Sequence, residues 1–316
     1  MPVTAIGIDL GGTKVQGALV DGSGELVEDA KVATPAGGVD DVVGAIVECV
    51  RRLGGADAAE GIGVGAPGVV ETSTGTVAHA PNLPGFATPV PLAALLREAL
   101  GLGTHGRVMV DNDVNAAVLG EHRFGAGRES SNLLGVWVGT GIGGGLVLDG
   151  RLRRGPGGAA GEIGHMGVVT GGGRLCGCGR HGHLEAYAGR ASMEREARRR
   201  HSDGSPTLLV ELAGAKRMKS SVFSKALDAA DAVAVELLDE AVTALGVGLA
   251  AATALVDLDL VVVGGGLADK LGPRFVGRVE QAVRSQLFIR SSPLRVAPAS
   301  LGDMAGAMGA ALLIER

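Results

Sequence analysis

A glycine-rich pattern occurs twice in this 316-residue chain, and the repeat constrains the fold more than any other feature. Residues 7–22 and 135–150 match at a shift of 128 positions. The matching residues are Gly7, Gly11, Gly17, Asp21 and Gly22 in the first copy and Gly135, Gly139, Gly145, Asp149 and Gly150 in the second. Apolar runs on either side of a small-residue turn predict a hairpin of buried strands. Two such hairpins, each opening a set of apolar strands, predict a duplicated two-domain protein.

The first hairpin turn, Gly11-Gly12-Thr13-Lys14, has the composition of a phosphate-binding loop. Backbone N–H groups in such a turn can surround a phosphate, and the last two side chains add donors. Asp9 stands just before the turn and suits a magnesium ion, bound directly or through water. An ordinary glycine hairpin is the alternative for this segment taken alone.

The second turn contains Gly139, Thr140 and Gly141. Two glycine turns facing each other across a cleft would hold a polyphosphate from both sides. At the same shift, Asp9 corresponds to Trp137 and Lys14 to Ile142, so the two turns are not equivalent. Only the first carries a candidate metal ligand.

A third glycine cluster, Gly264-Gly265-Gly266, follows a predicted buried strand over residues 258–263. A strand that ends in three glycines before a helix is a suitable place for a nucleotide base or ribose to lie against backbone. Close packing of strand and helix explains the same pattern equally well.

Residues 161–185 contain two of the three cysteines and three of the seven histidines. Cys176 and Cys178 place two thiolates within reach of one ion, and His165 and His183 complete a tetrahedral zinc site. Four protein ligands leave no open position, so this zinc is expected to be structural. His181 is the alternative fourth ligand, and reduced thiols on a solvated loop are the alternative to a metal site. The folded loop is expected to present Glu162, Glu185 and one face of His165 to a ligand.

Four polar residues follow a predicted strand over residues 107–110, namely Asp111, Asn112, Asp113 and Asn115. A helix is predicted over residues 116–123. The junction between a strand end and a helix start is where α/β proteins place chemistry. Helix capping is the alternative, but it requires only one of these residues.

Charge and composition exclude several classes of protein. The net charge of −5 disfavours a general nucleic-acid binder. The first residues lack the pattern of a signal peptide, and the uncharged runs over residues 130–148 and 241–256 are too glycine-rich or too short for membrane spans. Three cysteines do not form a disulfide framework. We therefore expect a soluble, cytoplasmic protein with small-molecule partners.

Periodicity predicts an α/β organisation. The expected strands cover residues 5–10, 15–20, 61–65, 107–110, 258–263 and 294–297, and the expected helices cover 40–53, 91–100, 188–200, 226–256, 276–287 and 304–314. We expect a small domain over residues 1–110, completed by a C-terminal helix over about 301–316. A large domain with the cysteine loop is expected over residues 111–300.

These segments resemble the ROK family of bacterial sugar kinases, repressors and related open reading frames, nearly end to end. Residues 6–14 (I-G-I-D-L-G-G-T-K) resemble the family's first phosphate motif, 139–144 (G-T-G-I-G-G) the second, and 263–266 the adenosine motif. Asn112 and Asp113 with Asn115 resemble the catalytic motif. Residues 162–165 with 176–179 and 184–185 resemble the sugar and zinc signature. The family usually has a third cysteine where this chain has His183, so a Cys2His2 site is expected.

The resemblance implies an actin-like ATPase (ribonuclease H-like) duplicated fold, with two domains around a cleft, in a homodimer or homotetramer. It implies ATP-dependent phosphorylation of a hexose at the 6-hydroxyl, glucose to glucose 6-phosphate, with ATP, Mg²⁺ and structural Zn²⁺. Asp113 would be the base. Asn112, Glu162, His165 and Glu185 would bind sugar hydroxyls, with Gly68 and Asn82 as further candidates. The three glycine clusters, with Asp9, would bind the nucleotide.

Two rival functions follow from the same resemblance. A sugar-responsive repressor would carry a DNA-binding segment before the first phosphate motif, and we expect none here because that motif begins at Ile6. A non-catalytic sugar sensor is a further alternative, although Asp9, Asp113 and both glycine turns favour catalysis. A kinase for N-acetylmannosamine, mannose or fructose fits the residues as well as a glucose kinase does. Polyphosphate is the alternative donor, although Gly264–Gly266 favours a nucleotide.

Overall fold

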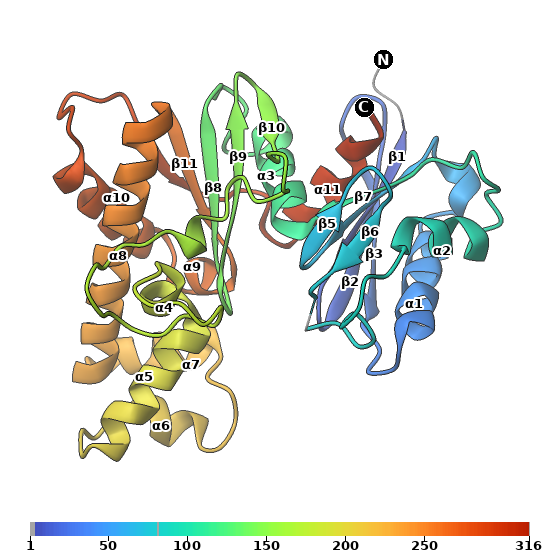
Figure 1. Cartoon of the computed structure of the whole chain (residues 1–316). Helices are drawn as coiled ribbons and strands as arrows, with labels where there is room; N and C mark the ends of the chain where they lie inside the picture. Colours follow the sequence, from blue (N-terminus) through green and yellow to red (C-terminus); the bar gives the residue numbers. More distant parts are fainter. Residues whose placement is uncertain (1–3, 81, 316) are drawn as a thin grey trace. The chain divides into compact units, whose positions relative to one another are not determined.

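The computed structural model describes residues 4–80 and 82–315, and its internal contacts divide the chain into two compact units (Figure 1). Unit 1 comprises Met1–Glu129, Leu152–Ala160 and Ser300–Arg316, and unit 2 comprises Ser130–Arg151 and Gly161–Ala299. The contacts therefore keep residues 111–129 with unit 1, whereas the expected domain boundary lay after residue 110. The boundary of the functional domains stays a prediction.

The chain contains two five-stranded sheets with the same strand order. The order is β3-β2-β1-β4-β7 in unit 1 and β10-β9-β8-β11-β12 in the second sheet. In each sheet one antiparallel hairpin, β1–β2 or β8–β9, is followed in the chain by two strands that run parallel to its first strand. These are β4 and β7 in the first sheet and β11 and β12 in the second. The predicted duplication is thus present in the topology.

The strands of the first sheet are β1 (Ala5–Leu10), β2 (Lys14–Val20), β3 (Leu26–Ala33), β4 (Ile62–Ala66) and β7 (Val108–Asn112), and β5 (Val69–Glu71) pairs with β6 (Thr76–Ala78). Those of the second are β8 (Leu133–Val138), β9 (Ile142–Leu148), β10 (Arg151–Arg153), β11 (Leu260–Gly264) and β12 (Arg295–Pro298).

In unit 1, helices cover both faces of the sheet (Figure 1). They are α1 (Val39–Arg52), α2 (Leu92–Ala99), α3 (Asp113–Phe124) and α11 (Ala305–Ala311), with the 3₁₀ turns η1 (Ala56–Ala58), η3 (Gly302–Met304) and η4 (Leu312–Glu315). The apolar faces of α1 and α2 pack on one face of the sheet, and α11 and α3 pack on the other.

Glycine allows α11 to approach the strands at backbone contact distance. A Cβ atom on Gly7 of β1 would lie 1.8 Å from the carbonyl oxygen of Ala307, and one on Gly63 of β4 would lie 1.8 Å from that of Ala310. No larger residue fits there without moving the helix. This packing also fixes α3, whose Ala116 carbonyl oxygen would lie 1.7 Å from a Cβ on Gly309. The start of α3 carries the predicted catalytic residues, so small residues in the core determine their position.

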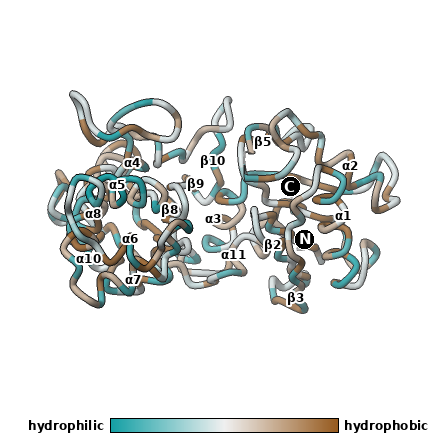
Figure 2. Tube along the Cα trace, turned by 90° about the horizontal axis from the view of Figure 1, so that it is seen from below, coloured by the Kyte–Doolittle hydropathy of each residue, from teal (hydrophilic) through white to brown (hydrophobic). Residues whose placement is uncertain are grey.

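Unit 2 has one large apolar core beneath α8 and α10. Its helices are α4 (Glu185–Ala188), α5 (Arg190–Ser202), α6 (Leu208–Ala213), α7 (Ser220–Asp228), α8 (Ala232–Val256), α9 (Gly266–Leu271) and α10 (Pro273–Gln286), with the turn η2 (Ile163–His165). Figure 2 shows α5 as a largely hydrophilic helix, in keeping with its run of arginines and glutamates. In the part of the chain that the structure describes, no helix has the length and apolar character to cross a bilayer.

The strand register corrects the sequence alignment of the two hairpins. Gly7 pairs with Ala18 in unit 1, and its counterpart Gly135 pairs with Gly145 in unit 2. Gly145 therefore occupies the place of Ala18 and not of Gly17. The second turn is one residue shorter, so Ile142 opposes Val138 as Val15 opposes Leu10, and Lys14 has no counterpart. The sequence alignment missed this because it allowed no gap.

Three helix predictions were wrong at their starts. The helix predicted over 276–287 begins three residues earlier, because Pro273 is the first residue of α10. The predicted helix over 226–256 is broken: α7 ends at Asp228, Ala230 has φ +53°, and Asp231 then caps α8 by accepting the N–H of Ala234 at 2.8 Å. The helix predicted from residue 116 begins at Asp113. Asp113 is therefore the first residue of α3, while the two residues before it belong to β7.

Candidate functional site

The first glycine turn is a tight, internally bonded loop. Gly11 N–H donates to the carbonyl of Lys14 at 2.9 Å, and Thr34 hydroxyl donates to the carbonyl of Gly11 at 2.6 Å. Lys14 Nζ forms an ion pair with Asp303 at 2.5 Å, and the Lys14 side chain is 28% exposed. The turn thus carries one ordered cation close to its backbone N–H groups, as a phosphate loop requires.

Asp9 and Asp113 form a pair of carboxylates in unit 1. Asp9 is aligned with Gly65 on β4, and a Cβ on Gly65 would lie 3.3 Å from Cα of Asp113. Burial of the carboxylate raises the pKa of Asp9, and the charge of Asp113 raises it further. Lys14 acts in the opposite direction, and the resulting pKa is about 7. Two carboxylates that disfavour each other's charge suit a shared divalent cation. The residues fit the magnesium ion expected at Asp9.

Asn112 caps α3. Its Oδ1 accepts the N–H groups of Val114 at 2.9 Å and Asn115 at 3.1 Å, and its Nδ2 donates to the carbonyl of Gly68 at 3.1 Å. One amide N–H is left for a ligand. Two predicted sugar-binding residues, Asn112 and Gly68, are thus brought together, and Asn112 has a structural role that the sequence offered as the alternative.

Asn82 lies against the first glycine turn. A Cβ atom on Gly12 would be 3.0 Å from the Asn82 carbonyl oxygen, so the loop and the turn meet backbone to backbone. Asn82 is itself exposed. The structure therefore places this predicted sugar-binding residue beside the predicted phosphate loop.

The side chain of Asp111 is only 2% exposed, and sequence reasoning missed its partner, Arg154. Asp111 Oδ2 accepts two hydrogen bonds from the Arg154 guanidinium, one of them at 2.7 Å from Nε. Its Oδ1 accepts the Asn112 N–H at 2.8 Å and the Asn115 amide at 3.2 Å. A buried carboxylate with this many donors holds the strand end before Asp113 in place. No sequence signal links residues 43 positions apart.

The second glycine turn is tied to Glu185. Ile142 N–H donates to Glu185 Oε2 at 2.9 Å, and a Cβ on Gly141 would lie 2.2 Å from the same oxygen. Gly139 accepts the N–H of Arg190 at 3.1 Å. A predicted sugar-binding carboxylate and a predicted phosphate turn therefore share a hydrogen bond, and only glycine at position 141 leaves room for it.

The third glycine cluster lies beside the second turn. Gly264 is aligned with Trp137 at the end of β8, and a Cβ on Gly265, which has φ +91°, would lie 2.8 Å from the Val138 nitrogen. The carboxyl ends of two parallel strands thus bring Gly264–Gly266 next to Gly139–Gly141. That edge is where open α/β sheets bind ligands.

The predicted metal ligands converge in unit 2. One ligand atom from each of His165, Cys176, Cys178 and His183 lies within 4.8 Å of the others. Cys178 Sγ is 3.3 Å from His183 Nδ1, and Cys176 Sγ is 3.8 Å from His165 Nδ1. Two thiols and two imidazoles at this separation fit tetrahedral zinc.

His181 points elsewhere. Its Nδ1 lies 3.2 Å from the carbonyl oxygen of Gly173, and it does not belong to the four-residue cluster. His181 and Leu175 form an isolated antiparallel bridge, as do His183 and Gly167. Gly182, between the two histidines, has φ +77° and interrupts the extended alternation that would place residues two apart on one side, so the two rings diverge and this geometry favours His183 over His181 as the fourth ligand.

Glu162 stands next to this cluster. Burial raises the pKa of Glu162; the charge of His165 lowers it and that of Glu185 raises it again. Glu185 reaches the cluster with its second oxygen, 3.7 Å from Cys176 Sγ. The loop thus gathers Glu162, His165 and Glu185. Their role in presenting polar groups to a ligand stays a prediction.

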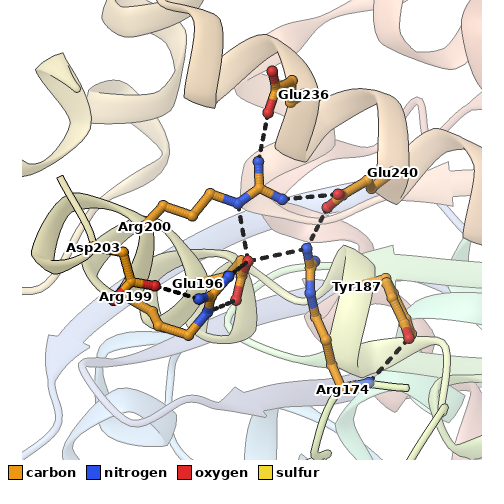
Figure 3. A network of polar contacts seen from close by, with 8 residues as sticks. All are labelled: Arg174, Tyr187, Glu196, Arg199, Arg200, Asp203, Glu236 and Glu240. Carbon is orange, nitrogen blue, oxygen red and sulfur yellow. Dashed lines mark hydrogen bonds and ion pairs between the residues drawn. The ribbon is translucent and has the colours of Figure 1, made fainter. Parts of the chain in front are cut away.

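An ion-pair network anchors the cysteine loop to α5 and α8 (Figure 3). Arg174, two residues before Cys176, contacts Glu196 at 3.5 Å and also pairs with Glu240. Its N–H donates to the Tyr187 hydroxyl at 3.0 Å, and its guanidinium lies 5.1 Å from the Tyr187 ring centre. The loop is therefore attached to α5 and α8 by protein contacts, whereas the predicted metal ligands all lie within the loop.

The strand order and helix placement define an actin-like ATPase fold, and comparison with known proteins identifies the family. The ROK family model matches residues 5–316, and the chain belongs to the ROK family. A glucokinase from Halalkalibacterium halodurans is 34% identical, covering 98% of this chain and 94% of its own. An N-acetylmannosamine kinase from Vibrio cholerae is 31% identical over 89% of each chain.

Solved structures agree. A ROK hexokinase from Thermus thermophilus matches with a TM-score of 0.83 and 34% identity over 98% of this chain and 97% of its own. A ROK family glucokinase from Streptomyces griseus, in complex with glucose and AMPPNP, matches with a TM-score of 0.80 and 35% identity over 98% of both chains.

Proposed function

We propose that this protein is an ATP-dependent hexose kinase that transfers a phosphoryl group to the 6-hydroxyl of glucose. The observation that carries the proposal is the carboxylate pair Asp9 and Asp113 beside the first glycine turn. A sugar sensor needs neither a cation site nor a base there. The similarity to glucokinases from other organisms supports the same activity.

Asp113 acts as the base. It takes the proton of the sugar hydroxyl, whose oxygen forms a bond to the γ-phosphorus while the bond from that phosphorus to the bridging oxygen breaks and ADP leaves. The buried Asp111–Arg154 pair holds the end of β7, directly before Asp113. Magnesium, when bound at Asp9, neutralises phosphate charge.

Glu162, His165 and Glu185 bind the sugar hydroxyls, with the free N–H of Asn112 as a further donor. Ionised carboxylates make short, strong hydrogen bonds to hydroxyl groups. In the metal-free loop Cys176 can donate its thiol proton to Glu185 Oε1. Zinc ligation requires the thiolate, which has no proton to donate. Zinc binding therefore leaves that oxygen for the sugar.

His165, Cys176, Cys178 and His183 hold a structural zinc ion. The four donors match zinc in type and number, and Arg174 fixes the loop beside them. Without metal, burial raises the pKa of the Cys176 thiol to about 11, so the ion is needed to obtain the thiolate. Reduced thiols fit a cytoplasmic enzyme, and the family implies a homodimer or homotetramer.

A kinase for another hexose or N-acetylhexosamine is the second candidate, and the similarity to N-acetylmannosamine kinase favours it. The experiment that tests both is ADP release from magnesium-ATP by the zinc-loaded protein. Glucose, mannose, fructose, N-acetylglucosamine and N-acetylmannosamine are compared, and polyphosphate is tested as donor. Release with glucose far above the other sugars supports the proposal, and release with N-acetylmannosamine alone moves it to the second candidate. No release with any sugar rejects the kinase and leaves the sensor.

A further inference from the structure

The second glycine turn lacks a counterpart of Lys14, but the tertiary structure supplies a cation from another element. Arg190, the first residue of α5, donates from Nη2 to the Thr140 hydroxyl at 2.8 Å. The N–H of the next residue, Ala191, donates to the Thr140 carbonyl at 2.9 Å. The guanidinium is thus fixed at the turn that the sequence identified as the second phosphate motif.

Arg190 keeps donors for a ligand. Its Nη1 donates to the carbonyl of Met218, so two of the five guanidinium N–H groups are engaged. Among the described residues neither Arg190 nor Arg217 has an ion pair with a carboxylate. Burial, and then the charge of Arg217, lower the pKa of Arg190, which places two cations close together. Glu194, the carboxylate whose charge acts on this pKa in the opposite direction, is engaged by Arg198 at 2.9 Å and by the Met218 N–H at 3.0 Å.

A basic loop, residues 214–219 (G-A-K-R-M-K), carries Arg217 between Lys216 and Lys219. Side chains of α5 hold its backbone. Arg198 donates to the carbonyls of Gly214 at 2.9 Å and Lys216 at 2.7 Å, Glu194 accepts from Met218, and Arg190 donates to Met218. The Met218 side chain is fully buried. The loop is therefore held in one conformation with three cationic side chains exposed.

The basic loop also approaches the third glycine cluster. A Cβ on Gly266 would lie 3.9 Å from the Ser220 hydroxyl, directly after the loop, and α7 packs on α9. Neighbouring cations repel one another and destabilise the folded protein, and an anion bound between them removes this cost. Guanidinium groups match the geometry of phosphate oxygens. The ligand chemistry this arrangement fits is a chain of phosphates.

We propose that Arg190 and Arg217 form the cationic part of the phosphate site at the second glycine turn, and that they bind the oligophosphate chain of the phosphoryl donor. In this site the half-buried Arg190 contacts the phosphates directly. The exposed Arg217 adds a positive charge that solvent screens. The assignment rests on the proposed kinase function for its donor. Nucleoside triphosphate and inorganic polyphosphate share this chemistry, and the test distinguishes them.

The test is calorimetric titration with magnesium-AMPPNP and, separately, with inorganic polyphosphate, together with the KM of each donor. Arg190→Gln is expected to weaken AMPPNP binding about ten- to a hundredfold, because a charge-assisted hydrogen bond is lost. Arg217→Gln is expected to weaken it about two- to fivefold, and that effect should shrink at high salt. The sugar KM and the zinc content should not change. Arg290→Gln, an exposed arginine before β12, is the matched control.

Unchanged AMPPNP and polyphosphate affinity in both variants overturns the inference, even if the wild type is an active kinase. If Arg190→Gln does not fold, Arg217→Gln and the triple variant with Lys216→Gln and Lys219→Gln decide the question, because these side chains are exposed. Weakened AMPPNP binding in a protein that phosphorylates no sugar rejects the proposed function and supports the site. A loss confined to polyphosphate identifies it as the donor.

Discussion

The two glycine turns differ in chemistry although they stand on sheets of the same topology. In unit 1, the turn is accompanied by carboxylates, Asp9 and Asp113, and by Lys14 from its own hairpin. In unit 2, the shorter turn takes its cation from α5 and its carboxylate from the cysteine loop. Duplication provides two glycine turns with similar backbone geometry. The side chains around each turn then determine what it can bind. Unit 1 is expected to govern the chemical step and unit 2 ligand recognition.

The largest effect is expected from Asp113→Asn, which removes the proposed base from unit 1. Turnover should fall by about 10² to 10⁴, the range for loss of a general base, while the dissociation constant for sugar stays near that of the wild type. Steady-state kinetics and sugar titration measure the two quantities. Asp57→Asn, at an exposed position in the same unit, is the control. Retained turnover would show that another group is the base.

Zinc removal tests the recognition role of unit 2. Dialysis against a chelator is expected to raise the sugar KM about ten- to a hundredfold, because the metal orients the residues that carry the sugar ligands. The affinity for AMPPNP should change much less. Elemental analysis and kinetics on the same samples provide the measurement.

A matched pair of variants identifies the fourth ligand. His183→Ala should lose zinc, whereas His181→Ala, whose side chain faces the Gly173 carbonyl, should retain it. The opposite pattern would transfer the role to His181.

The Asp9 carboxylate should make the stability of the metal-free protein depend on pH. Its pKa is raised to about 7, against 3.8 as the ordinary value. Between these pH values the folded protein holds a proton that the unfolded chain has released. The contribution of Asp9 to the free energy of unfolding therefore falls as pH rises from about 4 to about 7, and is constant above that.

Asp9→Asn removes this cost. The variant should be more stable than the wild type by up to about 4 kcal/mol at pH 8, from roughly 1.4 kcal/mol for each of about three pKa units, and by less at pH 5. Urea unfolding of both proteins without magnesium measures the difference. A difference that does not change with pH would contradict the expected titration.

The smallest effect is expected from Gly141→Ala. Its Cβ would lie 2.2 Å from Glu185 Oε2 and should displace the carboxylate from the Ile142 N–H, raising the sugar KM about fivefold. Gly139→Ala is the control, because nothing lies within 4 Å of its Cβ. Equal kinetics in the two variants would show that the link between turn and carboxylate does not matter.

Local pattern was enough to predict much of the fold. The strand over residues 5–10 has the bounds that the structure gives, because an apolar run before a glycine turn leaves little choice. The break between α7 and α8 at Ala229–Asp231 was missed. The only signal for it is the capping residue Asp231, which is weak within the long amphipathic stretch 226–256. The mostly exposed strand β3 has too few buried residues to be recognised.

The sequence by itself determined the duplicated α/β fold, the glycine turns and the residues of the cysteine loop. These depend on residue type and short spacing, which are local properties of the chain. Tertiary structure alone decided that Arg154 meets Asp111, that Arg190 meets Thr140 and that Glu185 meets Ile142. Each pair is more than 40 positions apart, and its contact depends on how helices and strands pack. Long-range charge pairing has no periodic trace in a sequence, so it became visible only once the backbone was folded.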